Sequence, residues 1–177
     1  MKKLIILGMI ILFTFTGCES NGRVHDKNYL RAVSVSGENE KSITFAFFNN
    51  DGKYITINAD DLNSAKELAE IRTGKKIFTG YTEMIILDDE NSLDILEFML
   101  KKWNVSPSCI IAYSKDTEHI FQNNIEKLTG SIKNAVKQNK APECDIITVM
   151  SGLLSDKHSA QIAEISDNGL TSIHKIN

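Results

Sequence analysis

The sequence predicts an α+β fold, in which a mixed β-sheet is packed with helices. The first third of the chain holds three successive segments rich in β-branched and aromatic residues, with hairpin turn chemistry between the second and the third. Short apolar segments and helical patterns then alternate along the middle of the chain. An N-terminal meander followed by strand–helix–strand–helix–strand connections combines antiparallel with parallel neighbours, so the sheet is expected to be mixed.

The composition is that of a globular protein, with 177 residues, 42% of them hydrophobic and 24% charged. The first 17 residues hold two of the 20 basic side chains and none of the 23 acidic ones, so the rest of the chain carries −5. Nucleic-acid binding needs a basic stripe, and an acidic body gives no reason to expect it. The same charge offers little attraction to anionic lipid.

Residues 1–17 have the layout of a secretory signal peptide. Lys2 and Lys3 supply positive charge, a 12-residue apolar run follows at residues 4–15, and small residues precede the expected cut. A helix that spans a bilayer needs about 20 apolar residues, so a permanent membrane span is the weaker interpretation. We therefore expect the chain to be exported.

Cys18 directly follows Gly17, an arrangement that resembles a bacterial lipoprotein signal. In such signals the cysteine thiol is acylated and becomes the first residue of the mature chain. Two acyl chains anchor a protein stably without a basic patch. Cys18 is thus the predicted lipid anchor, residues 18–28 are a polar tether, and the protein is expected at the outer face of a membrane. The alternative is an ordinary signal peptide with an incidental cysteine.

Residues 29–36, 42–48 and 53–58 are the three predicted strands of the meander, and residues 49–52 form the turn between the last two. A helix is expected next. Ser64 with Glu67 reads as a capping box, Leu68 and Ile71 mark the apolar positions, and Gly74 ends the helix.

The middle of the chain predicts two buried strands around one helix. The strands cover residues 82–87 and 109–113, and the helix begins near Ser92. Its outer face carries Glu97 and Lys101 as an i,i+4 pair. Its inner face is marked by apolar residues at helical spacing, namely Leu93, Leu96, Met99, Leu100 and Trp103.

Two further helices and a hairpin complete the chain. A third helix is marked by Phe121, Ile125, Leu128, Ile132 and Val136, with Gly130 as a weak point. A fourth is marked by Ile146, Ile147, Met150, Leu153 and Leu154. Residues 160–165 and 170–174 form the hairpin around Asp167-Asn168-Gly169. We divide the body into an α+β domain at 29–140 and a segment at 141–177, whose hairpin either pairs with the main sheet or begins a second domain.

Cys109 and Cys144 both lie in apolar surroundings. Outside the cytoplasm they could form one disulfide, and otherwise they are two buried thiols that act as small hydrophobes. Their apolar neighbours favour the second interpretation.

The sequence contains no motif for nucleotide binding, zinc proteolysis or serine hydrolysis, and we predict neither an enzyme nor a cofactor or metal site. Cys109 with His119 could form a nucleophilic pair, but a buried thiol and a solvated histidine are the favoured interpretation. Residues 88–90, Asp-Asp-Glu, could hold a cation, although a solvated turn before a helix is the simpler alternative. The pair at residues 60 and 61 is interpreted in the same way.

Residues 74–81, Gly-Lys-Lys-Ile-Phe-Thr-Gly-Tyr, and the apolar strand after them resemble the first domain of the Ger(x)C spore-germination lipoproteins. These proteins are the C subunits of germinant receptors. The likeness continues through residues 93–103, 108–115, 147–154 and 160–162, and through the lipid-anchor signal. Tyr81 stands where the family often has His, and family members continue into further domains.

The resemblance implies a non-enzymatic lipoprotein that acts in spore germination through contacts with integral membrane subunits of a germinant receptor. It implies a place on the outer face of the membrane, which would be the inner spore membrane, through lipid on Cys18. It carries over no catalytic, cofactor or metal residues. Two alternatives stay open: an extracytoplasmic small-solute-binding lipoprotein and a small surface hydrolase.

Overall fold

The structure is a computed structural model that describes residues 26–38, 40–48, 54–88, 92–117, 119–122, 125–166 and 168–177. The predicted signal peptide, the predicted lipid anchor Cys18 and the turn at residues 49–52 lie outside these residues. Among the described helices, none is both long enough and apolar enough to cross a membrane.

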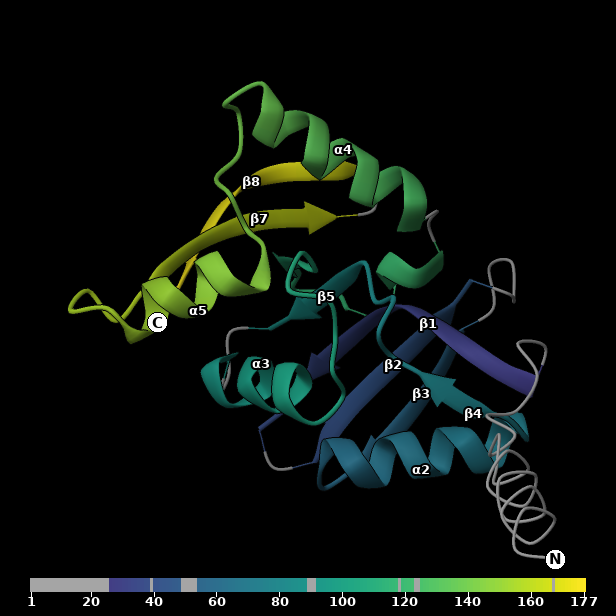
Figure 1. Cartoon of the computed structure of the whole chain (residues 1–177). Helices are drawn as coiled ribbons and strands as arrows, with labels where there is room; N and C mark the ends of the chain where they lie inside the picture. The colour runs from purple at the N-terminus through teal and green to yellow at the C-terminus, as the bar shows by residue number, and fades with distance from the viewer. Residues whose placement is uncertain are drawn as a thin grey trace, which may run out of the picture.

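The eight described strands form one mixed sheet (Figure 1). Seven of them follow the order β3-β2-β1-β5-β6-β7-β8, and β4 pairs with β1. Their bounds are β1 Lys27–Ser36, β2 Lys41–Phe47, β3 Tyr54–Ala59, β4 Lys76–Phe78, β5 Met84–Leu87, β6 Ile110–Tyr113, β7 Ala160–Ser166 and β8 Gly169–Ile176.

The pairing confirms the predicted α+β class. Strands β1, β2 and β3 form the antiparallel meander, while β1, β5, β6 and β7 run parallel to one another. The C-terminal hairpin of β7 and β8 is antiparallel and joins the main sheet through β6. In the structure this hairpin therefore pairs with the main sheet, which is the first of the two alternatives given above. The division of the chain at residue 140 stays a prediction.

The helices cover the sheet on both faces. Figure 1 shows α2, α3 and α5 together on one side, with α4 and α5 on opposite sides of the β7–β8 hairpin. The bounds are α2 Leu62–Thr73, α3 Ser92–Lys101, α4 Ile125–Lys137 and α5 Ile146–Leu154, with a 3₁₀ turn, η2, at His119–Gln122. The predicted third helix is corrected here, because Phe121 belongs to η2 and α4 begins only at Ile125.

The start of α2 also corrects the prediction. The helix is capped by Asp61 and not by Ser64. The Asp61 carboxylate accepts hydrogen bonds from the backbone N–H of Asn63 (2.8 Å) and of Ser64 (3.0 Å), which satisfies two free donors of the first turn. Ser64 instead donates its hydroxyl to Asp61 at 2.6 Å. Gly74 ends the helix in the left-handed conformation, as predicted.

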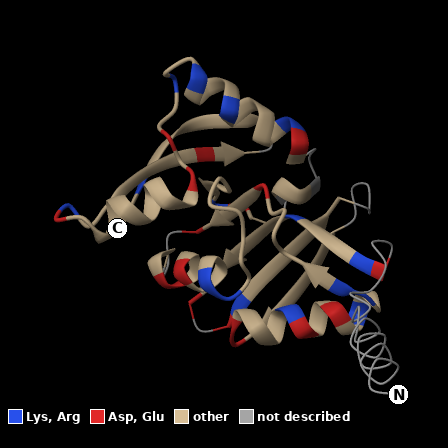
Figure 2. Cartoon of the chain, in the orientation of Figure 1, with Lys and Arg blue, Asp and Glu red and all other residues tan. Residues whose placement is uncertain are grey.

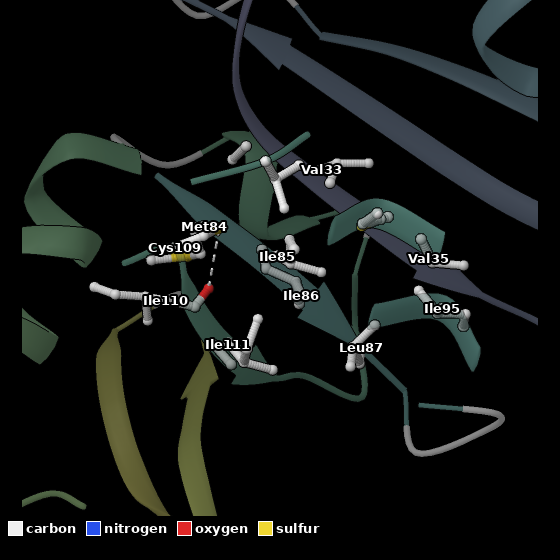
Figure 3. Packing of buried hydrophobic residues seen from close by; sticks show 14 of the residues in the cluster. Val33, Val35, Met84, Ile85, Ile86, Leu87, Ile95, Cys109, Ile110 and Ile111 are labelled. Carbon is white, nitrogen blue, oxygen red and sulfur yellow. Dashed lines mark hydrogen bonds between the residues drawn. The ribbon is translucent and has the colours of Figure 1, made fainter. Parts of the chain in front are cut away.

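The core lies where the short parallel strands are covered on both faces. All four residues of β5 and all four of β6 are buried (Figure 3). Side chains alternate between the faces of a strand, so complete burial requires a cover on each side. On one side α3 supplies Ile95, Leu96 and Met99. The predicted outer pair on this helix, Glu97 with Lys101, forms an ion pair.

Candidate interaction surface

Three aromatic rings contact one another at the amino end of the parallel strands. Tyr29 of β1 pairs in register with Phe78 of β4, and their ring centres are 5.6 Å apart. Tyr81 stacks on Tyr29 at 6.0 Å and meets Phe78 edge-on at 5.2 Å. Phe78 is 37% exposed and Tyr81 is 63% exposed. The rings support one another and still present apolar surface to the outside.

The turn after β4 holds these rings in place. A Cβ atom at Gly80 would lie 2.9 Å from Cζ of Phe78, so only glycine leaves the Phe78 ring where it is. The hydroxyl of Thr79 donates to the backbone carbonyl of Trp103, and the Thr82 hydroxyl donates to the carbonyl of Thr79 at 2.6 Å. Because both threonines are buried, the turn is fixed from inside and Tyr81 projects outward.

Charged groups surround the rings. Nζ of Lys27 lies 6.0 Å from the centre of the Phe78 ring. Glu70 of α2 accepts hydrogen bonds from Nζ of Lys76 at 2.6 Å and from the backbone N–H of Ile77 at 3.0 Å. Burial favours the protonated acid, but these two donors outweigh it and hold the pKa of Glu70 below its ordinary value. Glu70 also raises the pKa of Lys76, so both groups stay charged at neutral pH.

Two neighbouring grooves extend this end of the molecule. One groove of about 450 Å³ lies between α2 and β4 and is lined by Lys27, Asn63, Lys66, Glu67, Glu70, Lys76, Ile77 and Phe78. The second, of about 370 Å³, shares three of these residues and includes Ile71, whose side chain is 75% exposed. We use the name aromatic–basic surface for Lys27, Tyr29, Ile71, Lys76, Phe78 and Tyr81.

The sequence prediction missed this surface, because it took Leu68 and Ile71 as the apolar positions of α2 without assigning them to a face of the helix. They are exposed, whereas the residues of α2 that pack inward are Leu62, Ala65 and Ala69. Small side chains allow the helix to lie close to the sheet, and the larger apolar ones then face outward. The signal available in the sequence was the pair of alanines four residues apart.

Cys109, which was considered as a nucleophile and interpreted instead as a buried thiol, is buried in the structure. It lies 1% exposed beside β5 and β6 (Figure 3), and burial raises its pKa far above the ordinary value. Thiolates and not thiols attack substrates, so Cys109 is unsuited to that role. His119 begins η2, and its side chain lies outside the described part of the chain.

Cys109 and Cys144 are both free and buried, in agreement with the favoured prediction. The segments that carry them are joined by backbone hydrogen bonds, from Ile111 N–H to the Cys144 carbonyl (2.7 Å) and from Ile146 N–H to the Cys109 carbonyl (3.0 Å). Burial raises the pKa of Cys144 to about 11. Both side chains therefore act as small hydrophobes within the core.

The carboxyl end of the parallel strands is polar. Asp88 accepts a hydrogen bond from the backbone N–H of Gly37 at 2.7 Å, and the hydroxyls of Ser36 and Thr117 lie 3.3 Å apart. A hollow of about 490 Å³ is lined by Ser114, Lys115, Asp116, Ile120, Glu164, Ile165, Ser166, Asn168, Thr171 and Ser172. Asp89 and Glu90, the other two acids of the turn that was considered as a cation site, lie outside the described residues. Within the described ranges, no three His, Cys, Asp or Glu side chains are grouped to hold a metal ion.

A family model described as "Spore germination protein N-terminal domain" matches residues 25–166. It covers the whole sheet up to the end of β7, and it confirms the resemblance seen in the sequence. No curated protein matches, and no solved structure matches.

Proposed function

This chain belongs to the spore germination protein N-terminal domain family, which gives it a part in spore germination, and we propose that it acts there as a lipoprotein. Lipid on Cys18 holds the mature chain at the outer face of the membrane, the inner membrane in the spore. The folded body then works through contacts with integral membrane subunits of a germinant receptor. It does so without catalysing a reaction.

The observation that carries this proposal is the short distance along the chain between Cys18 and the sheet. The cysteine follows an apolar run and Gly17, and β1 begins nine residues later at Lys27. An acidic body gives no electrostatic reason to stay on a membrane, and a 12-residue apolar run is shorter than a span. Two acyl chains on one sulfur supply the missing attachment.

The non-enzymatic part of the proposal is supported by the surroundings of the candidate nucleophile. Cys109 is buried, and its protonated form is favoured. At the carboxyl end, the hydroxyls of Ser36, Ser114 and Thr117 bond to the backbone or to one another, and the Ser172 hydroxyl donates to the Glu164 carboxylate. A buried, protonated thiol is a poor nucleophile, so Cys109 gives no support to a thiol enzyme.

The anchor is tested by replacing Cys18 with alanine in a spore-forming host supplied with an alkyne analogue of palmitate. We expect wild-type protein to carry the label and to stay in the membrane fraction, and Cys18→Ala to lose both properties. Cys144→Ala is the matched control, because that thiol is buried in the core and should leave labelling unchanged. A Cys18→Ala protein that stays firmly in the bilayer would overturn the anchor.

The partner is tested by mild detergent extraction of sporulating cells followed by affinity purification of the tagged chain. Recovery of polytopic membrane subunits in stoichiometric amounts is the expected result. Recovery of the chain alone, from spores that do contain those subunits, would contradict the receptor role and leave the lipid anchor standing.

A small-solute-binding lipoprotein is the second candidate, favoured by the hollow at the carboxyl ends of β6 and β7. Ligands of parallel α/β sheets bind at that end. If this candidate is correct, germinant amino acids or sugars raise the melting temperature of the protein, and Ser114→Ala removes the shift. A flat response across the panel excludes it.

A further inference from the structure

We propose that the aromatic–basic surface lies against the headgroup layer of the bilayer and holds the domain in one orientation on it. This inference rests on the proposed lipid anchor at Cys18. It adds a second contact with the same membrane, made by the folded body and not by the lipid.

The length of the tether selects this end of the molecule. Lys27 is nine residues after Cys18, and a fully extended chain spans at most about 3.3–3.6 Å per residue, so β1 begins within about 30 Å of the anchored sulfur. The surface includes Lys27 itself and Tyr29, two positions further on. Strand β1 has ten residues, so its far end lies about 30 Å from its start at about 3.3 Å per residue, and the tether limits the position of the start more closely. The amino end is therefore the part of the sheet that the tether brings to the bilayer.

The side chains at this end are those that membrane interfaces favour. Tyrosine rings are enriched at the headgroup level, because an apolar ring and a polar hydroxyl suit the two sides of that boundary. Tyr81 is mostly exposed, and Phe78 and Ile71 add apolar surface beside it. Three rings already in contact lose little conformational freedom on binding.

The local charge differs from that of the whole body. The two grooves beside the rings are lined by four basic side chains, Lys27, Lys66, Lys75 and Lys76, and two acidic ones, Glu67 and Glu70. The mature chain as a whole is acidic. Figure 2 shows both signs intermixed along α2, with basic residues where β1 and β4 begin. Long lysine stems can lie along an apolar surface while their ammonium groups reach lipid phosphates.

The experiment uses the lipid-anchored full-length protein reconstituted in vesicles of brominated phosphatidylcholine with 30% phosphatidylglycerol (about one lipid in three, enough to give a negative surface). Tyr81→Trp places a reporter on the surface, and Ile173→Trp places one on β8, where the replaced side chain is 49% exposed. Trp103 is buried and contributes the same background to both. We expect bromine to quench the reporter at position 81 at least twofold more strongly than the one at position 173.

Charge is tested with Lys75→Glu in the Tyr81→Trp protein, and Lys140→Glu, an exposed lysine after α4, is the matched control. Only Lys75→Glu should reduce the quenching, by about half, and the reduction should disappear in vesicles without phosphatidylglycerol. Circular dichroism checks that each variant is folded. Equal effects of the two lysine variants would contradict a local electrostatic contact.

The outcomes separate this inference from the proposed anchor. Protein that does not float with the vesicles refutes the anchor itself. Protein that floats, with equal quenching at positions 81 and 173, refutes the membrane contact and leaves the anchor intact. Fluorescence at position 81 that changes only when the receptor subunits are added would assign the surface to a protein partner and would also overturn the inference.

Discussion

The two ends of the parallel strands present opposite kinds of surface. At the amino end, three aromatic rings and an exposed isoleucine face outward among lysines. At the carboxyl end, short polar side chains bond to one another and to nearby backbone groups, and Asp88 ties two loops together. Binding proteins with parallel sheets use the carboxyl end for ligands. Here the exposed side chains of Ile71, Phe78 and Tyr81 lie at the other end, where β1 begins nine residues after Cys18.

This difference supports the proposal that the domain makes its contacts at the end of the sheet that is nearest to Cys18 along the chain. Exposed apolar groups gathered on one side of a folded domain mark a contact with another molecule or with lipid. Polar groups that already bond to one another offer less to a ligand, because binding must replace bonds that exist. Four predictions compare how substitutions at the two ends and in the shared core change the stability of the fold.

The largest effect is expected in the centre, which both ends share. Ile86 is fully buried in β5, and Ile86→Ala should lower the free energy of unfolding by about 3 kcal/mol, through lost burial and the cavity that remains. Ile71→Ala at the amino end should change it by less than about 0.5 kcal/mol, because that side chain is exposed. Urea denaturation measures both. A large loss for Ile71→Ala would place it in the core and weaken the case for an interaction surface.

The next effect concerns the packing of α5 against the amino end of β7. A Cβ atom at Gly152 would lie 2.9 Å from the Ser159 carbonyl oxygen and 3.0 Å from Cβ of Ala160. Gly152→Ala should therefore destabilise by about 2 kcal/mol through overpacking. Gly130→Ala is the matched control in α4, where a Cβ meets nothing within 4 Å, and it should stabilise by about 0.5–1 kcal/mol. Thermal unfolding should shift in opposite directions for the two variants.

A smaller effect is expected at Arg31, which joins the amino end to α4. Its guanidinium donates to Glu83 at 3.0 Å and to Glu126 at 2.9 Å, and it lies 4.8 Å from the centre of the Phe48 ring. Since Glu126 is largely exposed, Arg31→Ala should cost about 1–2 kcal/mol and not the sum of two buried pairs. Arg31→Lys keeps the charge but not the forked geometry, so it should recover only part of the loss. A full recovery in Arg31→Lys, measured by denaturation at low and high salt, would show that charge alone matters.

The smallest effect is expected at two helix caps, one at each end of the parallel strands. Asp61 caps α2 near the carboxyl end, and Asp145 caps α5 beside the amino end of β6 through the same bonds. Burial opposes ionisation of Asp145, but the Thr148 hydroxyl and the backbone N–H groups outweigh it and lower its pKa. Asp145→Ala should cost about 1 kcal/mol at pH 7, and Asp145→Asn less, because its amide oxygen still accepts.

The pH dependence of the caps follows from the direction of these pKa shifts. Bonds from the Ser64 hydroxyl and backbone N–H groups likewise lower the pKa of Asp61. A lowered carboxyl pKa stabilises the fold above the unfolded value of 3.8, and this stabilisation is lost as the pH falls through the folded value. The difference between wild type and Asp145→Ala should therefore shrink below about pH 4 in acid-denaturation curves. A difference that stays constant down to pH 2 would contradict the assignment of the cap.

Local patterns predicted most of the elements. The meander, the helix after Ser92 and the C-terminal hairpin were all expected within a few residues of their observed bounds. Each depends on neighbours in the sequence, such as alternation along a strand or apolar spacing along a helix. The three-residue strand β4 was missed, because Lys76–Phe78 has no strand pattern of its own and is a strand only through pairing with β1.

The sequence by itself determined the order of the elements, the family resemblance and the predicted anchor at Cys18. Each of these depends on residues that are close together in the chain, as the pattern of a signal peptide and the apolar spacing of a helix do. Only the tertiary structure decided which apolar side chains face outward. Whether Leu68 and Ile71 are core depends on how closely Ala65 and Ala69 let α2 approach the sheet. Tyr29, Phe78 and Tyr81 meet because β4 pairs with β1, a contact between distant segments that neither segment specifies alone.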